Sequence, residues 1–133
     1  MSELPAGVRS FLDQHIFSAS QLEVLLLLHG RSGRPLTVLD AAREARLPAS
    51  AIEPWLQAFA ARGLLAHDYA GYAFRPQDPR TADAVDQVAE AYRRRRTTVS
   101  RYLYARGQDP LTRFADAFRL RRDTDPAGSD EES

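Results

Sequence analysis

The chain has 133 residues, no formal net charge, and 44% hydrophobic and 27% charged residues, a composition typical of one globular domain. It contains no cysteine, which excludes disulfides, thiolate metal sites and cysteine nucleophiles together. All 18 basic residues are arginines, and 18 acidic residues balance them. The N-terminal residues do not resemble a signal peptide, and the longest apolar run, Val24 to Leu28, is far shorter than the roughly 20 residues of a membrane span. We therefore expect a cytoplasmic protein that makes no membrane contact.

Two helices are predicted at the start of the chain. Residues 5–17 carry an amphipathic stripe that includes Val8, Phe11, Leu12 and Ile16. Residues 18–30 hold the longest apolar run, and a helix that is apolar on nearly every face packs against neighbours on several sides. We expect this second helix to lie at the centre of the domain.

The segment from Thr37 to Gly63 predicts two short helices joined by a tight turn. Thr37 can cap the first helix, and Leu47-Pro48 ends it, because the residue before a proline is pushed out of the helical region. Ser50 is expected to cap the second helix, which ends at Gly63. The spacing of three apolar residues in this second helix places them on one buried face: Ile52, Leu56 and Phe59.

A small β-wing and further helices are predicted after this pair. Leu64 and Leu65 begin a strand, Ala70-Gly71 form the turn, and the chain returns antiparallel as far as residue 76. From Thr81 the apolar spacing predicts one long helix to about Arg106. A last amphipathic helix is predicted over residues 111–120. The tail at 123–133 has five acids and no base, so we expect it to be disordered.

The predicted fold class is therefore mainly α with a two-stranded β-wing, a winged helix-turn-helix with extra N- and C-terminal helices. It forms a single domain over residues 1–122. Its parts are an N-terminal helix at 5–17, the winged helix-turn-helix at 20–76 and C-terminal helices at 81–122.

Several residues of this pattern carry a family resemblance. They lie where winged helix-turn-helix proteins place the residues that pack the turn and enter the wing: Ala42, Leu47, Ile52, Leu56 and Gly63-Leu64-Leu65. Over residues 20–76 the chain resembles bacterial transcription factors of the MarR-like group. The resemblance implies double-stranded DNA as a partner and a homodimer joined through helices at both chain ends. Arg46 stands at the turn position that usually holds glycine.

Candidate DNA-binding residues follow from the expected placement of the two helices and the wing. Four arginines are candidates for phosphate contacts: Arg43, Arg46, Arg62 and Arg75. Ser50 and Gln57 are expected at the groove, where a glutamine can bind adenine through two hydrogen bonds.

A different function class stays open at this point. Four acids balance the four arginines between Thr37 and Pro76: Asp40, Glu44, Glu53 and Asp68. The alternative is a winged-helix module that binds a protein partner through Trp55 and Pro54 instead of DNA. The chain lacks a glycine-rich phosphate loop, a nucleophile elbow and a His/Asp/Glu cluster with ligand spacing. We therefore expect no enzyme, no catalytic residue, no metal and no cofactor.

Overall fold

The computed structural model describes residues 4–108, which form six α-helices and one two-stranded antiparallel sheet. The elements are α1 (Ala6–His15), α2 (Ala19–His29), α3 (Val38–Ala45), α4 (Ala49–Ala61), β1 (Leu65–Asp68), β2 (Gly71–Phe74), α5 (Pro79–Arg94) and α6 (Arg96–Gln108). The predicted helix at 111–120 and the predicted tail at 123–133 lie outside the described residues. Within residues 4–108, no helix combines the length and apolar character that crossing a membrane requires.

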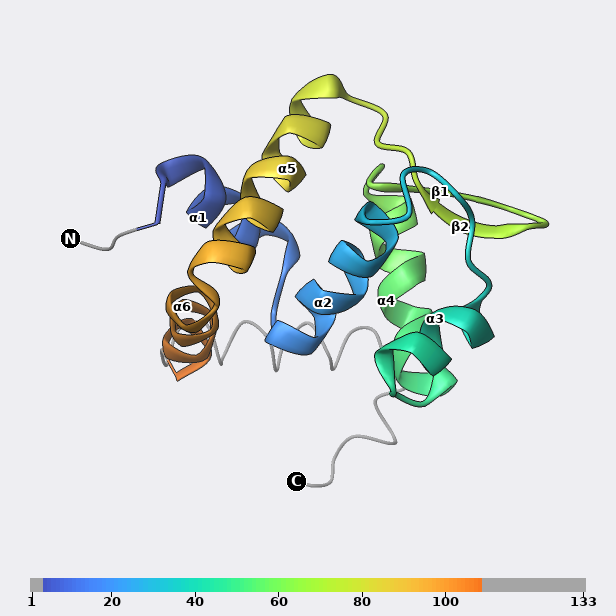
Figure 1. Cartoon of the computed structure of the whole chain (residues 1–133), viewed down its shortest axis with the longest axis horizontal. Coiled ribbons are helices and arrows are strands. Elements are labelled where there is room, and N and C mark those ends of the chain that lie inside the picture. Colours follow the sequence, from blue (N-terminus) through green and yellow to red (C-terminus); the bar gives the residue numbers. More distant parts are fainter. Residues whose placement is uncertain (1–3, 109–133) are drawn as a thin grey trace, which may run out of the picture.

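Helix α2 lies at the centre of the described fold, as its apolar sequence predicted. It contacts α3, α4 and β2. Helix α1 packs along α5 (Figure 1). Ser18 caps α2 by accepting a hydrogen bond from the Gln21 backbone N–H at 3.1 Å. The residues of α2 that are buried in the core include Leu22, Val24, Leu25 and Leu28.

Helices α3 and α4 form the predicted helix-turn-helix. The Thr37 hydroxyl accepts a hydrogen bond from the Asp40 backbone N–H at 3.0 Å, which confirms the predicted cap of α3. The predicted Ser50 cap is wrong, because α4 begins at Ala49 and Pro48 is its N-cap. Proline suits a helix start, where its missing N–H leaves no internal bond unmade. The predicted buried face of α4 is confirmed: Ile52, Leu56 and Phe59 are all buried.

The wing is a hairpin that follows α4 directly. Leu65 pairs with Phe74 and Asp68 with Gly71, so the turn consists of Tyr69 and Ala70. The predicted turn at Ala70-Gly71 is therefore wrong by one residue, because Gly71 already pairs as the first residue of β2. The Asp68 carboxylate stabilises this turn by accepting the Ala70 backbone N–H at 2.8 Å. In Figure 1 the hairpin projects from the body of the molecule beside α3 and α4.

A third backbone segment joins this sheet, which sequence patterns did not predict. Leu36 and Tyr72 exchange two backbone hydrogen bonds of 2.8 Å, forming an isolated antiparallel bridge. The bridge attaches the segment before α3 to the second strand of the wing. A single bridging residue has no periodicity, so a pattern search cannot find it.

The single long helix predicted from Thr81 to about Arg106 is wrong, because the chain forms two helices with a break at Arg95. Asp78, and not Thr81, is the N-cap of α5. Arg95 leaves the helical region at φ −135° and ψ 53°. Its N–H still closes α5 on the Ala91 carbonyl, and its carbonyl accepts the Val99 N–H that opens α6. The break therefore leaves these backbone groups satisfied, and it needs no glycine or proline to mark it.

We expect the substitution Gly71→Ala to destabilise the fold by about 1–3 kcal/mol. Gly71 has a φ of +127°, and a Cβ atom there would lie 2.3 Å from the Leu36 carbonyl oxygen. The measurement is urea denaturation of the variant and the parent protein. Gly7→Ala is the matched control, because a Cβ at Gly7 meets its nearest neighbour at an ordinary 3.6 Å. The account of the wing would be wrong if both variants unfolded at the same urea concentration.

Candidate nucleic-acid interface

The outward face of α4 is an exposed strip that mixes polar residues with small apolar ones, opposite the buried side of the helix. Ser50 and Gln57 are both exposed and lie two helical turns apart, so they share this face. Glu53 and Pro54 lie between them and are also exposed. Trp55 is half-buried and packs against the core, so only part of its ring is accessible. The strip thus presents one hydroxyl, one amide and one carboxylate within two turns.

Two of the four predicted phosphate-binding arginines lie at the turn between α3 and α4. The Arg43 side chain is 76% exposed and forms an ion pair with Asp40 at 3.3 Å. An ion pair this exposed contributes little stability, so Arg43 can exchange Asp40 for another anion at small cost. Arg46 is exposed and adopts the left-handed conformation, with φ 61°. Glycine is favoured in that conformation, so an arginine places a cation at a strained backbone position.

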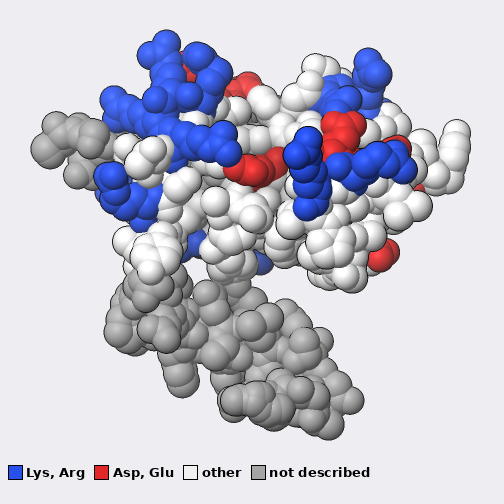
Figure 2. Space-filling model, turned by 60° about the horizontal axis from the view of Figure 1, so that its bottom comes forward, with Lys and Arg blue, Asp and Glu red and all other residues white. Residues whose placement is uncertain are grey.

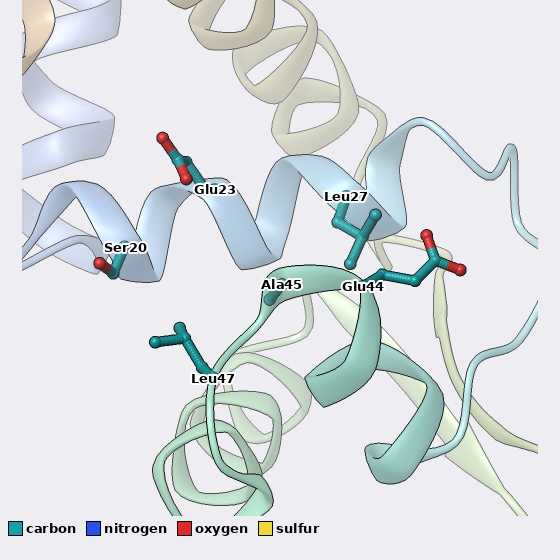
Figure 3. Close-up of a pocket in the computed structure, with 6 residues that line it drawn as sticks. All are labelled: Ser20, Glu23, Leu27, Glu44, Ala45 and Leu47. Atoms are coloured by element: carbon teal, nitrogen blue, oxygen red, sulfur yellow. The ribbon is translucent and has the colours of Figure 1, made fainter.

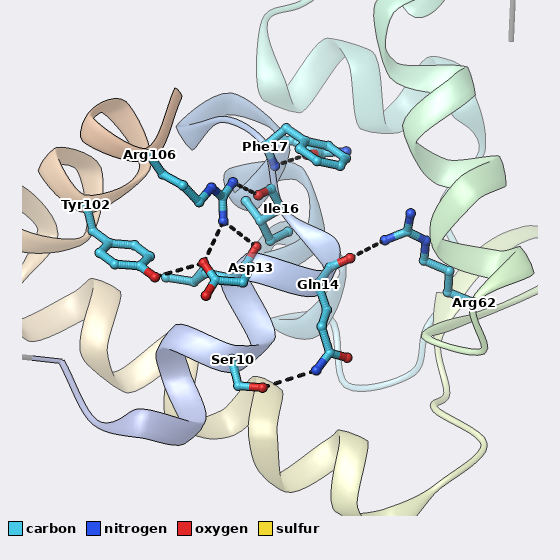
Figure 4. Close-up of polar contacts among 10 residues, drawn as sticks. Ser10, Asp13, Gln14, Ile16, Phe17, Arg62, Tyr102 and Arg106 are labelled. Carbon is cyan, nitrogen blue, oxygen red and sulfur yellow. Dashed lines mark hydrogen bonds and ion pairs between the residues drawn. The ribbon is translucent and has the colours of Figure 1, made fainter. Parts of the chain in front are cut away.

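The other two predicted phosphate-binding arginines connect elements of the fold. The Arg75 guanidinium donates to the Gly33 carbonyl at 3.0 Å, which joins the end of β2 to the loop between α2 and α3. The Arg62 guanidinium donates to the Gln14 carbonyl at 2.6 Å, which joins the C-terminal end of α4 to α1 (Figure 4). Arg62 therefore lies at the opposite end of α4 from Arg46. The predicted contacts of Arg62 and Arg75 with DNA stay predictions.

Another arginine, which sequence reasoning missed, binds the end of α1 that Arg62 also contacts. Arg106 on α6 donates to the Leu12 carbonyl at 2.8 Å and to the Ile16 carbonyl, and it pairs with Asp13 at 3.1 Å (Figure 4). The Tyr102 hydroxyl also donates to Asp13, at 2.8 Å. Burial, followed by this hydrogen bond to Asp13, raises the pKa of Tyr102. No local pattern marks Arg106, because its partners lie at the other end of the chain.

His15 lies where α1 meets Arg62. Its ring packs on Phe11 at 4.7 Å between centroids, and its Nδ1 lies 3.4 Å from the Arg62 guanidinium. Burial lowers the pKa of His15, and the positive charge of Arg62 lowers it further. The neutral imidazole is therefore the form that this junction favours.

The elements around α4 together define the fold. Two helices meet at a tight turn, the second has a polar outward face, and an antiparallel hairpin follows it directly. The chain folds as a winged helix-turn-helix. Within the described part of this winged helix, no cluster of three or more His, Asp or Glu side chains has an arrangement that could hold a metal ion.

Comparison with known proteins finds similarity to solved structures. A MarR family protein of Mycobacterium tuberculosis, Rv2887, has 17% sequence identity and a TM-score of 0.49, with 89% of this chain and 83% of that chain covered. BpsR of Bordetella bronchiseptica, whose structure is described with the regulation of its DNA binding by 6-hydroxynicotinic acid, has 21% identity and a TM-score of 0.46. That match covers 90% of this chain and 84% of the other. No family model and no curated protein matches the sequence.

We expect the stability of the winged helix to depend on the protonation of His15. The unfolded chain binds the proton more readily, since the folded pKa lies below the ordinary value of 6.5. The stabilising contribution is therefore present above that value and is lost as the pH falls below it. Urea denaturation between pH 5 and 8 should show a smaller loss on acidification for His15→Gln than for the parent protein. Equal losses in the two proteins would show that this junction does not sense protonation.

Proposed function

We propose that this protein is a DNA-binding transcriptional regulator that acts as a homodimer. The observation that carries the proposal is the outward face of α4, where Ser50 and Gln57 lie two turns apart on the same face of a helix supported by the core. Arg43 and Arg46 lie at the turn that leads into this helix. In this arrangement a helix can enter the major groove while cations beside it contact the phosphates.

Each group on this surface has a chemical role in the proposed complex. Gln57 can donate to and accept from an adenine edge, and Glu53 can accept from the amino group of cytosine. Ser50 can bind a base or a phosphate oxygen at the N-terminal end of α4. Arg43 and Arg46 provide charge that is independent of sequence. The strained backbone at Arg46 supports a functional role, because a glycine would fit that position without cost.

Arg75 and Arg62 have a second role in this proposal, which is to hold the reading surface in position. Arg75 fixes the base of the wing against the loop before α3, and its exposed position also allows a phosphate contact. Arg62 fixes the far end of α4 on α1. Changing Arg62 would therefore alter the orientation of α4 as well as the charge.

The proposed homodimer is supported by the layer that α1, α5 and α6 form apart from the helix-turn-helix. A groove of about 460 Å³ lies between α1 and α5. Charged residues, including Arg94 and Arg95, line it together with four apolar residues: Leu4, Pro5, Val8 and Ala91. Tyr104 on α6 is an exposed aromatic residue on the same layer. A second copy that covers this layer would give a dimer with two α4 helices, and recognition of two half-sites requires two such helices.

We expect substitutions at Arg43 and Gln57 to separate phosphate contacts from base recognition. Arg43→Gln should weaken binding to all duplexes alike and reduce the slope of log affinity against log salt by about 0.9. Gln57→Ala should instead change the preference at one base pair by roughly 1–3 kcal/mol. Site selection with purified protein, followed by salt titrations of fluorescence anisotropy, measures both effects. We would abandon the DNA proposal if the parent protein bound no duplex at low ionic strength.

We expect the chain in solution to have about twice its mass of 14.9 kDa. Static light scattering at micromolar concentration measures this directly. The physical reason is the apolar groove between α1 and α5, which a monomer would leave in contact with water. A mass of one chain across the concentration range would contradict the homodimer.

The second candidate function is a winged-helix module that binds a protein through Pro54 and Trp55. Two large apolar side chains near α4 favour it: Leu39 is exposed at the start of α3, and Tyr69 is fully exposed at the wing tip. The segment from Thr37 to Pro76 is also neutral, whereas nucleic-acid-binding domains are usually basic. This candidate predicts that Pro54→Glu abolishes capture of a protein partner and that Arg43→Gln has no effect on capture.

A further inference from the structure

The break between α5 and α6 carries a dense group of exposed arginines. Three of them, here called the junction arginines, lie outside the groove between α1 and α5: Arg93, Arg96 and Arg101. Arg94 and Arg95 line that groove. Glu90 pairs with both Arg93 and Arg94, and Glu23 pairs with Arg96 at 2.8 Å. Three arginines thus share two carboxylates. Arg101 has no carboxylate partner among residues 4–108.

The Glu90 carboxylate stays ionised, and the surface still keeps excess positive charge. Hydrogen bonds from Arg93 and then from Arg94 lower the pKa of Glu90. The Glu23 carboxylate is held by Arg96 and by the Tyr92 hydroxyl, which donates to it at 2.6 Å. Four arginines outnumber these two carboxylates, so the junction is cationic: Arg93, Arg94, Arg96 and Arg101.

A hollow of about 200 Å³ lies between α2 and the end of α3 (Figure 3). On one side its lining includes Glu23, the partner of Arg96. On the other side it includes Glu44, which pairs with Arg31 from the loop before α3. The ion pairs of α5–α6 and of the α2–α3 region therefore border the same depression.

The turn that leads into α4 lies beside this hollow. Ala45 and Leu47 line it, and Arg46 stands between them in the chain. Figure 2 shows arginines gathered in two groups on one face of the molecule, with acidic side chains between the groups. One extended ligand can therefore contact both groups without passing around an edge of the molecule.

Duplex DNA fits this distribution of charge better than a compact anion does. A duplex carries one negative charge per about 1.7 Å of its axis, so it can bridge separated cationic groups. The segment that carries α3, α4 and the wing is neutral and provides little attraction by itself. Arginine binds phosphate through two parallel N–H donors, and exposed ion pairs such as Arg93 with Glu90 exchange at little cost.

We infer that the junction arginines form a second phosphate-contacting surface, which binds the same duplex that α4 reads. The inference rests on the proposed DNA-binding function and assigns it a source of affinity outside the helix-turn-helix. In this arrangement, α4 distinguishes sequences and the junction arginines supply binding that does not depend on sequence.

The test compares two arginines of α5 that each form an exposed ion pair. Arg93 is 67% exposed and pairs with Glu90, and Arg80 is 91% exposed and pairs with Asp78. They lie about 20 Å apart along the helix at 1.5 Å per residue. Each is replaced by glutamine in the full chain, and affinity for a duplex of about 30 base pairs is measured by fluorescence anisotropy as salt is raised.

We expect Arg93→Gln to lose one phosphate contact and Arg80→Gln to lose none. For Arg93→Gln, the fall in affinity between about 50 and 200 mM salt should be three- to fourfold smaller than for the parent protein. Arg80→Gln should retain the parent's salt dependence. Arg101→Gln, which breaks no ion pair among the described residues, should behave like Arg93→Gln. Equal urea denaturation midpoints would exclude misfolding as the cause.

Each contrary result has a separate meaning. If Arg93→Gln and Arg80→Gln have the same salt dependence while Arg43→Gln has a reduced one, the second surface is overturned and the DNA-binding function stands. If the parent protein binds no duplex at low salt, the proposed function itself is overturned. If Arg93→Gln weakens binding and Arg101→Gln does not, the effect belongs to the Glu90 ion pair, which also overturns the inference.

Discussion

The C-terminal end of α1 fixes the relative position of three helices, because carbonyl groups at this end accept hydrogen bonds from arginines of α6 and of the end of α4. Arg106 on α6 donates to the carbonyls of Leu12 and Ile16, and Arg62 at the end of α4 donates to that of Gln14. Arg106 lies 94 residues from Leu12, and Arg62 lies 48 residues from Gln14. A hydrogen bond with a charged donor contributes about 1.5–3 kcal/mol. The orientation of α4 relative to α1, α5 and α6 therefore depends on a single helix end.

The helix-turn-helix could be predicted from the sequence because its determinants are local. The Thr37 cap acts over three residues, and the buried face of α4 follows from helical spacing alone. The same spacing placed Ser50 and Gln57 together on the exposed face. The wing was also predictable, since its strands are consecutive and its turn has two residues.

The remaining features depend on contacts between residues that are distant in the sequence. The partners of Arg62 and Arg75, on α1 and in the loop before α3, could not be read from any short pattern. The break at Arg95 has no glycine or proline to reveal it, and only the three-dimensional arrangement shows that Arg96 reaches Glu23 on α2. Candidate site residues were thus predictable as exposed or buried, whereas their partners were not.

The bridge between Leu36 and Tyr72 has a consequence for how the protein opens. Its two backbone hydrogen bonds close a loop that contains α3, α4 and the first strand of the wing. The amide protons of Leu36 and Tyr72 can exchange with solvent only when this loop opens. The strand that closes it carries the buried Tyr72 ring in the core. The wing and the helix-turn-helix should therefore unfold as one cooperative unit, with exchange at the bridge as slow as exchange in the middle of α4.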